Sequence, residues 1–250
     1  MIRFAANISL LFTELPLLDR IAAARDAGFD AVEILFPYDH DPALIRARLQ
    51  HCGMPLALIN TPAPDWQSGG RGSAALPGAE KRFQREFAYA LEVAGALGAE
   101  KLHVMSGRAG GAAAKERLIA NLHWACDAAA GLNLTIEPIN TTDMPGYFLD
   151  DFDLAADVLD RVKAANLSLQ FDAYHAARIT GDPVATWARH GHRATHVQIA
   201  DAPGRHEPGS GHIDFASFFA RLEATGYRGY VSAEYHPADT TTRGLGWLRR

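Results

Sequence analysis

The feature of this sequence that most limits its fold is a regular alternation of short apolar runs and longer helical segments. Runs rich in strand-forming residues occur at residues 4–8, 31–35, 56–60, 101–106, 134–137, 168–172, 195–199 and 230–234. Apolar residues at helical spacing predict helices at residues 17–27, 42–52, 78–97, 112–130, 151–165, 183–191 and 215–225. Strands that alternate with helices in this way form a parallel sheet.

The number of these units predicts how the sheet is arranged. Eight strand-and-helix units are typical of a sheet closed into a single (β/α)8 TIM barrel, and we expect one domain over residues 1–250. The alternative is an open, doubly wound sheet, which usually carries a glycine-rich phosphate loop after its first strand. The sequence there reads SLLFTELP and contains no glycine, so the barrel is favoured.

A long segment after the third predicted strand stands apart from the rest. It reads APDWQSGGRGSAALPGAEKR and is rich in glycine, serine and proline. Barrel enzymes carry their chemistry on the loops that follow the strands. We therefore expect this segment to cover a site and not to separate two domains.

Charge and composition exclude several classes of protein. The formal net charge of −5 opposes a nucleic-acid-binding surface, which needs a basic stripe. No apolar run approaches the length of a membrane span, and the first residues do not resemble a signal peptide. Cys52 and Cys126 lie in predicted helices at a spacing that fits no paired metal motif, so we expect buried thiols. These features predict a cytoplasmic protein with no membrane or nucleic-acid partner; association into a homo-oligomer is left open.

Polar side chains with oxygen atoms end four consecutive predicted strands. They are Glu137, Asp172, Gln198 and Glu234, spaced by 35, 26 and 36 residues. In a closed barrel the carboxyl ends of the strands lie around one rim, so these side chains should converge on a common centre. Three converging carboxylates repel each other unless a cation lies between them. The pattern predicts a divalent metal site, and the oxygen ligands favour Mg²⁺ or Mn²⁺.

Several motifs resemble those of the hydroxypyruvate isomerase family, within the xylose isomerase-like barrels. They include LTIEPIN, LQFDAYH, HVQIAD, PGSGHIDF and YVSAEYHP, together with INTPAPDW, LHVMSG and the first 40 or so residues. The resemblance implies that Glu137 and Glu234 act as proton donor and acceptor. It also implies that Glu137, Asp172, Gln198 and Glu234 surround the metal position, although members of the family differ in whether they require a metal.

The resemblance implies an isomerase that interconverts hydroxypyruvate and tartronate semialdehyde. A proton would move between neighbouring carbons through a cis-enediolate, with one glutamate removing it and the other returning it. Two alternatives use the same barrel: a 2-oxotetronate isomerase and a ketose 3-epimerase. Relatives of the epimerase type usually carry histidine where this chain has Gln198, which favours the isomerase branch.

Further residues are predicted to bind the small hydroxy-oxo-acid substrate. His175 lies three residues after Asp172 and could hydrogen-bond a substrate oxygen, and Arg205 could hold a carboxylate with two parallel hydrogen bonds. Asn7 and Asn60 end the first and third strands and could line the pocket. The sequence favours a core role, and not a ligand role, for a histidine within a strand such as residue 103.

Three other functions fit the sequence less well. A zinc-dependent DNA-repair endonuclease needs several further histidines on other strands, where this chain has residues such as Asn60. A Schiff-base aldolase needs a lysine at the inner end of a strand. Lys101 begins its strand instead, and the other lysines lie in helices or at helix starts. A barrel that only binds a small acid would not need the paired glutamates.

Overall fold

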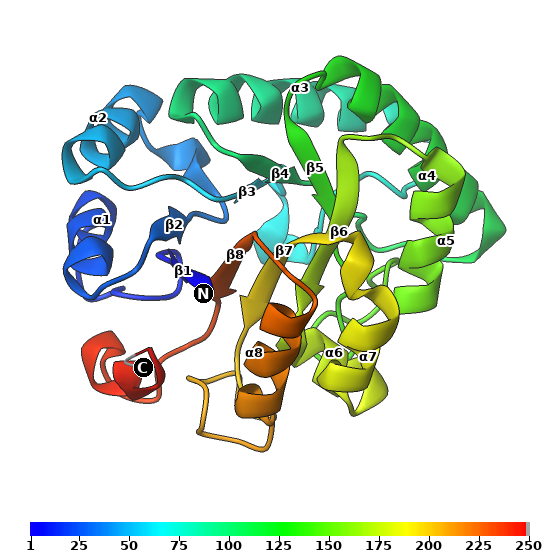
Figure 1. Ribbon diagram of the computed structural model, residues 1–250. Helices are drawn as coiled ribbons and strands as arrows, with labels where there is room; N and C mark the ends of the chain where they lie inside the picture. The colour runs from blue at the N-terminus through cyan, green and yellow to red at the C-terminus, as the bar shows by residue number, and fades with distance from the viewer. Residues whose placement is uncertain (249–250) are drawn as a thin grey trace.

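Eight parallel strands form a nearly closed barrel in a computed structural model that describes residues 1–248 (Figure 1). The strands are β1 (Arg3–Asn7), β2 (Ala31–Glu33), β3 (Ile59–Asn60), β4 (Lys101–His103), β5 (Asn133–Ile136), β6 (Leu167–Asp172), β7 (Ala194–Ile199) and β8 (Tyr230–Ala233). Their order around the sheet is β2-β1-β8-β7-β6-β5-β4-β3. The predicted TIM barrel is confirmed, and each predicted strand is found, several of them shorter than expected.

Two contacts between non-adjacent parts of the chain close the ring. β1 pairs with β8, with Arg3 opposite Tyr230. Between β2 and β3, the Val32 amide donates to the Pro55 carbonyl at 2.9 Å, and the Ala57 amide donates to the Val32 carbonyl at 2.8 Å. The carboxyl ends of the strands therefore meet at one rim, as the sequence predicts.

Helices surround the strands on the outside of the barrel (Figure 1). They are α1 (Leu17–Asp26), α2 (Pro42–Cys52), α3 (Glu80–Leu97), α4 (Gly111–Ala128), α5 (Phe152–Val162), α6 (Ala173–Thr180), α7 (Pro183–His190) and α8 (Phe215–Ala224). Short 3-10 helices are η1 (Pro37–Asp39), η2 (Trp66–Ser68), η3 (Gly191–Arg193) and η4 (Thr241–Trp247). Two helical elements were not predicted from the sequence: α6, which begins directly after β6, and the 3-10 helix η4, which follows β8.

The ends of several helices follow from local sequence. Asp41 and Asp182 each precede a proline, and each side chain accepts a hydrogen bond from a backbone amide in the first turn. Asp172 does the same for α6, where it accepts from the amide of Tyr174. Since Asp172 also ends β6, one residue joins a strand to a helix with no loop between them.

Apolar packing is concentrated between the strands and the surrounding helices. The outward-facing Phe171 of β6 contacts Trp187 and Phe218, with ring centroids 5.1 and 5.9 Å apart. Cys52 and Cys126 are buried free thiols in α2 and α4, as predicted. None of the helices in residues 1–248 combines the length and apolar character that crossing a membrane requires.

Inside the barrel the residues are small or polar. A small apolar cluster contains Ala5, Ala31, Ala57 and Tyr230. Around it lie fully buried polar side chains, namely Thr135, Gln170, His196 and Ser232. TIM barrel interiors are more often filled by bulky branched residues. The polar interior of this barrel lies directly beneath the rim where the predicted site residues end their strands.

Candidate active site

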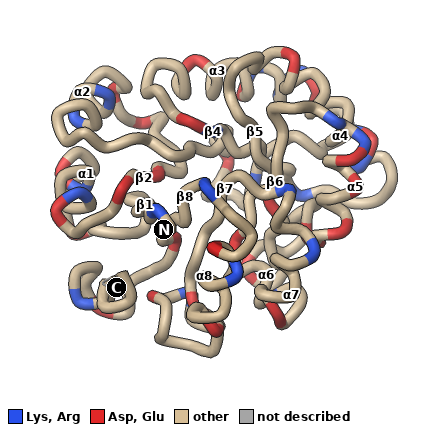
Figure 2. The backbone as a smooth tube through the Cα atoms, viewed as in Figure 1, with Lys and Arg blue, Asp and Glu red and all other residues tan. Residues whose placement is uncertain are grey.

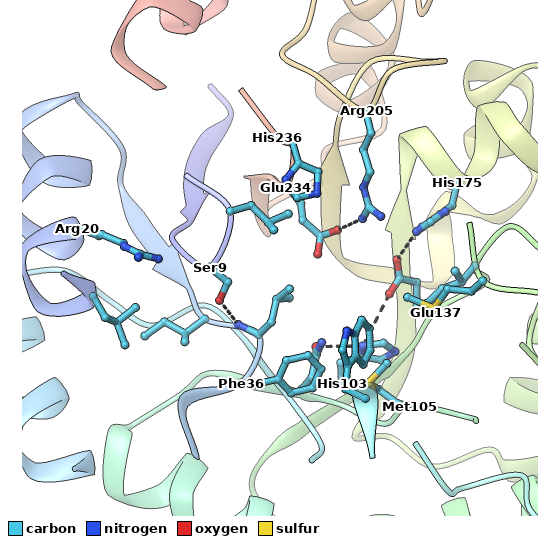
Figure 3. Close-up of a pocket in the computed structure, with 18 of the residues that line it drawn as sticks. Ser9, Arg20, Phe36, His103, Met105, Glu137, His175, Arg205, Glu234 and His236 are labelled. Carbon is cyan, nitrogen blue, oxygen red and sulfur yellow. Dashed lines mark hydrogen bonds and ion pairs between the residues drawn. The ribbon is translucent and has the colours of Figure 1, made fainter. Parts of the chain in front are cut away.

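Both predicted proton-transfer glutamates line one cavity at the carboxyl end of the barrel (Figure 3). The cavity has a volume of about 600 Å³, within the range of small-molecule sites. Glu137 directly follows β5 and Glu234 directly follows β8. Arg205 points between them in Figure 3, and His175 points at Glu137.

Each of the three acidic side chains is fixed by protein donors. Asp172 Oδ1 accepts from the amide of Tyr174 at 2.7 Å. Glu137 Oε2 accepts from Gln170 Nε2 at 2.9 Å, and Glu234 Oε2 accepts from Arg205 Nη2 at 2.9 Å. In contrast, Glu137 Oε1 and Asp172 Oδ2 are buried and accept no hydrogen bond from any described residue. These two oxygen atoms are therefore free to bind a further group.

Burial raises the pKa values of all three acids, and repulsion between their negative charges adds to the increase. Burial raises the pKa of Glu137 well above its usual range, and the charges of Glu234 and Asp172 raise it further. Burial also raises the pKa of Glu234 to about 8 and that of Asp172 to about 6, although Arg205 opposes both shifts. The pKa of Arg205 is raised in turn, because the carboxylates outweigh the effect of its own burial. The three buried acids therefore carry more potential negative charge than Arg205 compensates.

These features fit a bound divalent cation. Atoms of Glu137, Asp172 and His175 lie within 4.8 Å of one another, in a buried group that could hold a metal ion. The two carboxylate oxygens without donors belong to this group. An ion bound there would satisfy both oxygens and reduce the repulsion between the acids. The two other predicted ligands have oxygens that already accept hydrogen bonds. Gln198 Oε1 accepts from Gln170 Nε2, and Glu234 Oε2 accepts from Arg205.

The hydrogen bonds of His175 indicate how its ring is protonated. Its Nδ1 lies 3.4 Å from the backbone nitrogen of Asn140, which can only donate. The side-chain Nδ2 of Asn140 also approaches Nδ1, at 2.7 Å, and the carboxylate of Asp143 fixes that amide's orientation. Since Nδ1 accepts, a neutral ring carries its hydrogen on Nε2. Nε2 lies 3.8 Å from Glu137 Oε1 and 3.6 Å from Asp172 Oδ2, so in this tautomer His175 faces the site as a donor and leaves the metal position to the two carboxylates.

The loop after β7 holds Arg205 rigidly. The Asp201 carboxylate accepts from the backbone amides of Gly209, Gly211 and Ile213, all at 2.9 to 3.0 Å. Arg205 itself has a positive φ of 55°, and its amide donates to the Asp201 carbonyl. Its guanidinium lies over the ring of Tyr174. The prediction that Arg205 lies at the site is consistent with this geometry, although its visible partner is Glu234.

A continuous run of hydrogen bonds, here called the polar chain, links the two glutamates beneath the cavity. Its members in order are Glu234, Asn7, Glu33, Gln198, Gln170 and Glu137. Asn7 Nδ2 donates to Glu234 Oε1 at 3.3 Å and to Glu33 Oε1 at 2.8 Å. Gln198 Nε2 donates to Glu33 Oε1 at 2.6 Å, and Gln170 Nε2 donates to both Gln198 Oε1 and Glu137 Oε2. Asn7 and Gln198 therefore belong to the hydrogen-bonded network that holds the two glutamates.

Sequence reasoning missed Glu33, Gln170 and His196, which are all fully buried. Glu33 ends β2 just as Glu137 follows β5, so the rule that identified Glu137 could also have identified Glu33. The predicted strand extended to residue 35, so Glu33 was assigned to the middle of an apolar strand and not to its end. His196 Nε2 lies 2.7 Å from Glu33 Oε2.

Residues at the ends of β3 and β4 and on the loop after β3 form another part of the cavity wall. Asn60 lines it as predicted, and its Oδ1 lies 3.1 Å from His103 Nδ1. His103 is buried, as the core interpretation required, but it also lines the cavity and lies 3.7 Å from Glu137 Oε2. Burial lowers its pKa to about 3. Trp66, from the long loop, lines the cavity beside Phe36, so this loop does border the site.

Comparison with known proteins identifies the class to which this architecture belongs. Residues 21–250 match the model of the xylose isomerase-like TIM barrel family. The chain belongs to this family, and the predicted family is confirmed.

Full-length relatives narrow the assignment. The chain is 45% identical to a protein of Cupriavidus necator named 2-oxo-tetronate isomerase, over 99% of this chain and 97% of that protein. It is 38% identical to the hydroxypyruvate isomerase of Escherichia coli, over 99% of this chain and 98% of that protein. These matches support an isomerase.

Solved structures agree on the fold. A Brucella melitensis structure described as an AP endonuclease, family 2, superposes with a TM-score of 0.96 at 41% identity, covering 99% of this chain and 98% of that one. A D-allulose 3-epimerase from a Methylomonas species superposes with a TM-score of 0.77 at 23% identity, covering 98% and 88%. The second likeness shows the fold alone.

Proposed function

We propose that the protein isomerises a short hydroxy-oxo-acid by moving a proton between neighbouring carbons, with Glu137 and Glu234 as the exchanging acid and base. The observation that carries this proposal is the arrangement of two buried glutamates on one small cavity. Each glutamate has one oxygen fixed by an amide nitrogen of the polar chain. The full-length relatives that are named isomerases support the same reaction class.

The proton shift can be written with hydroxypyruvate as the substrate. One glutamate takes a proton from the carbon that bears the hydroxyl group, and the electrons of that C–H bond form the double bond of a cis-enediolate. The other glutamate gives a proton to the former carbonyl carbon, and the hydroxyl proton moves between the two oxygens. Tartronate semialdehyde results. The pKa of Glu234, which burial raises to about 8, suits this exchange because this residue must both hold and release a proton near neutral pH.

We assign a divalent cation, Mg²⁺ or Mn²⁺, to Glu137 Oε1 and Asp172 Oδ2. When bound, it would supply positive charge that stabilises the enediolate oxygens. Gln198 and Glu234 were also predicted as ligands. We do not include them in this assignment, because Gln198 Oε1 and Glu234 Oε2 already accept hydrogen bonds from Gln170 and Arg205; their ligation stays a prediction. His175 Nε2–H would donate to a substrate oxygen, and Arg205 would orient the substrate carboxylate with the guanidinium donors that Glu234 leaves free.

Two acids are the leading substrate candidates, and the size of the cavity bears on the choice between them. Hydroxypyruvate is the simplest substrate for the reaction. A four-carbon 2-oxotetronate is the second candidate, because the cavity extends well past the acids toward Leu17 and Phe36. The Cupriavidus necator relative carries that name at 45% identity. A free ketose lacks the carboxylate that Arg205 would hold, so a ketose 3-epimerase is less well supported.

The endonuclease name of the Brucella melitensis structure raises a different function, which the site supports less. Among the described residues, His103 and His175 lie beside Glu137. A multi-zinc endonuclease would need further histidines on other strands, where this chain has Asn7, Asn60 and Gln198. Basic and acidic segments alternate around the outer helices (Figure 2), and the net charge is −5. A DNA-binding surface would need a concentrated basic stripe.

A turnover screen tests the proposal. Hydroxypyruvate, both 2-oxotetronate enantiomers and free ketoses are incubated with the protein, with and without Mg²⁺ or Mn²⁺, and the products are followed by proton NMR in D₂O. We expect turnover of a carboxylate substrate with deuterium incorporated beside the carbonyl. Glu137→Gln and Glu234→Gln should each lower kcat by about 10²- to 10⁴-fold while the protein stays folded. Near-normal rates in either variant would refute the two-base scheme.

Arg205→Ala tests the carboxylate contact separately. KM should rise more for hydroxypyruvate than for a carboxylate-free analogue, and an equal rise for both would assign Arg205 another role. Two further properties stay predictions from the sequence: localisation of the protein in the cytoplasm and its association into a homo-oligomer.

A further inference from the structure

Glu33 has the most restrictive position in the polar chain. Its side chain is fully buried, and Oε1 lies 2.8 Å from Asn7 Nδ2 and 2.6 Å from Gln198 Nε2. It touches neither the cavity nor a reacting atom in the proposed mechanism. A buried carboxylate is costly unless donors surround it, so its presence beneath the site requires a reason.

The carboxylate determines which way the neighbouring amides point. A side-chain amide has one end that donates and one that accepts, and the two ends have nearly the same shape. An ionised carboxylate can only accept. Turning the Gln198 amide over would place its oxygen against Glu33 Oε1, and two acceptors at 2.6 Å repel each other. Gln198 must therefore present Nε2 to Glu33 and Oε1 to the other side.

This orientation is passed along the polar chain to the catalytic glutamate. Gln198 Oε1 accepts from Gln170 Nε2 at 2.8 Å, so Gln170 must present its nitrogen on that side. The same nitrogen donates to Glu137 Oε2 at 2.9 Å. Thr135 Oγ1 donates to the other end of the amide, Gln170 Oε1, at 3.0 Å, which is consistent with this direction. On the opposite side, Asn7 Nδ2 donates to both Glu33 and Glu234, but the backbone amide of Ser9 donates to Asn7 Oδ1 at 3.1 Å and fixes the direction of that amide independently.

We propose that Glu33 is a positioning residue that sets the donor direction of Gln198 and Gln170 and thereby holds the proton-transfer residue Glu137 as an acceptor in a fixed orientation. The proposal rests on the proposed function, since that function assigns Glu137 its role. Glu33 acts through Gln198 and Gln170 and touches no substrate. It explains why the barrel interior contains a carboxylate that the reaction itself does not use.

Replacing Glu33 by glutamine tests the proposal, because the amide has nearly the same shape but can donate. In Glu33→Gln, the Gln198 amide is free to turn over, and Gln170 can then no longer donate to both of its partners. We expect kcat to fall about 10- to 100-fold, as for other residues that orient catalytic groups, while KM changes by less than about threefold. Glu80→Gln is the matched control, because Glu80 pairs with Arg117 on the outer helices. Its kcat should equal that of the wild type.

A spectroscopic measurement reports the amide direction without any turnover. In the wild type, the side-chain NH₂ groups of Gln198 and Asn7 both face Glu33 Oε1, so they should give a nuclear Overhauser contact. Glu33→Gln should lose or weaken it. If the contact and kcat both stay as in the wild type, Glu33 does not set the direction and the proposal is wrong.

Two further outcomes are decisive. If Glu33→Gln does not fold, Gln170→Met interrupts the polar chain at another residue with a side chain of similar size, and wild-type kcat in that variant would refute the proposal. If the wild type turns over none of the tested acids, the proposed function fails. In that case the Overhauser contact alone tests whether Glu33 sets the amide direction: its loss in Glu33→Gln supports this role, and its persistence refutes it.

Discussion

The inside of the barrel and the layer between barrel and helices are both buried, yet they differ in chemistry. The outer layer packs large aromatic side chains such as Phe171, Trp187 and Phe218 against one another. The inside contains alanines, with Gln170, His196 and Ser232 buried around them. Both faces belong to the same strands, because successive side chains alternate between them.

The difference shows how one set of strands serves two purposes. The outer layer buries large apolar area and supplies stability. The inside gives up that contribution, and its small alanines leave room for polar side chains that support the acids at the rim. We therefore expect substitutions in the two regions to differ in effect. Outer changes should affect stability, and inner changes at residues that bind or support the acids should affect the site.

The largest expected effect is on stability, in the outer layer. Phe218 is fully buried and its ring contacts those of Phe171 and Trp187. Phe218→Ala should lower the free energy of unfolding by about 3–5 kcal/mol, because it removes buried area and leaves a cavity. Urea denaturation measures this, and kcat well below the unfolding transition should stay close to wild type. A large loss of kcat in the folded variant would contradict the separation of the two regions.

Asp172→Ala changes the inside of the barrel. It removes one of the two carboxylate oxygens that lack a donor among the described residues. The affinity for Mn²⁺ should fall by at least about tenfold, and titration calorimetry measures it. Asp172 also caps α6, so Asp172→Asn serves as a control that keeps an oxygen at the cap. Unchanged binding in Asp172→Ala would remove this residue from the metal site.

The stability of the metal-free protein should depend on pH in a direction set by the buried acids. Burial raises the pKa of Glu234 from its ordinary 4.5 to about 8. Between pH 4.5 and about 8 the folded state keeps a proton that the unfolded chain releases, so the contribution of Glu234 to stability is greatest below pH 4.5 and is lost as pH rises toward about 8. Asp172 adds to this fall at the lower end of the range. Tm measured with EDTA should decrease from about pH 5 to about pH 8, and added Mn²⁺ should flatten the decrease. A Tm that rises over this range would contradict it.

The smallest effect is expected at Ser232, on the inside of β8. Its hydroxyl is buried and has no hydrogen-bond partner among the described residues. Ser232→Ala should therefore leave the free energy of unfolding unchanged or raise it by about 1 kcal/mol, with no loss of kcat. A clear destabilisation would indicate that this hydroxyl contributes to the polar interior.

Much of this organisation could be predicted from the sequence because it depends on periodicity. Strand and helix order follow from local apolar patterns, and the rim follows from strands that end at the same side of a barrel. Glu137, Asp172, Gln198 and Glu234 were therefore found together. Glu33 was not, because a strand of three residues continues into apolar residues and its end is invisible to the pattern.

Other features could not be predicted because they depend on three-dimensional contacts. The hydrogen on His175 Nε2 is determined by Asn140, a residue 35 positions earlier. The partner of Arg205 is Glu234, which directly follows β8. Likewise α6 begins directly after β6, and a sequence pattern gives no separate signal for a helix whose capping residue, Asp172, also ends the preceding strand.

The pairing of β1 with β8 has a consequence for how the protein is made. Strand β1 hydrogen-bonds to β8, which is synthesised much later, with Arg3 opposite Tyr230. A nascent chain on the ribosome therefore carries one unpaired edge of β1 until β8 has emerged. Because an unpaired strand edge invites pairing with other chains, this seam is where chaperone protection during translation would matter most.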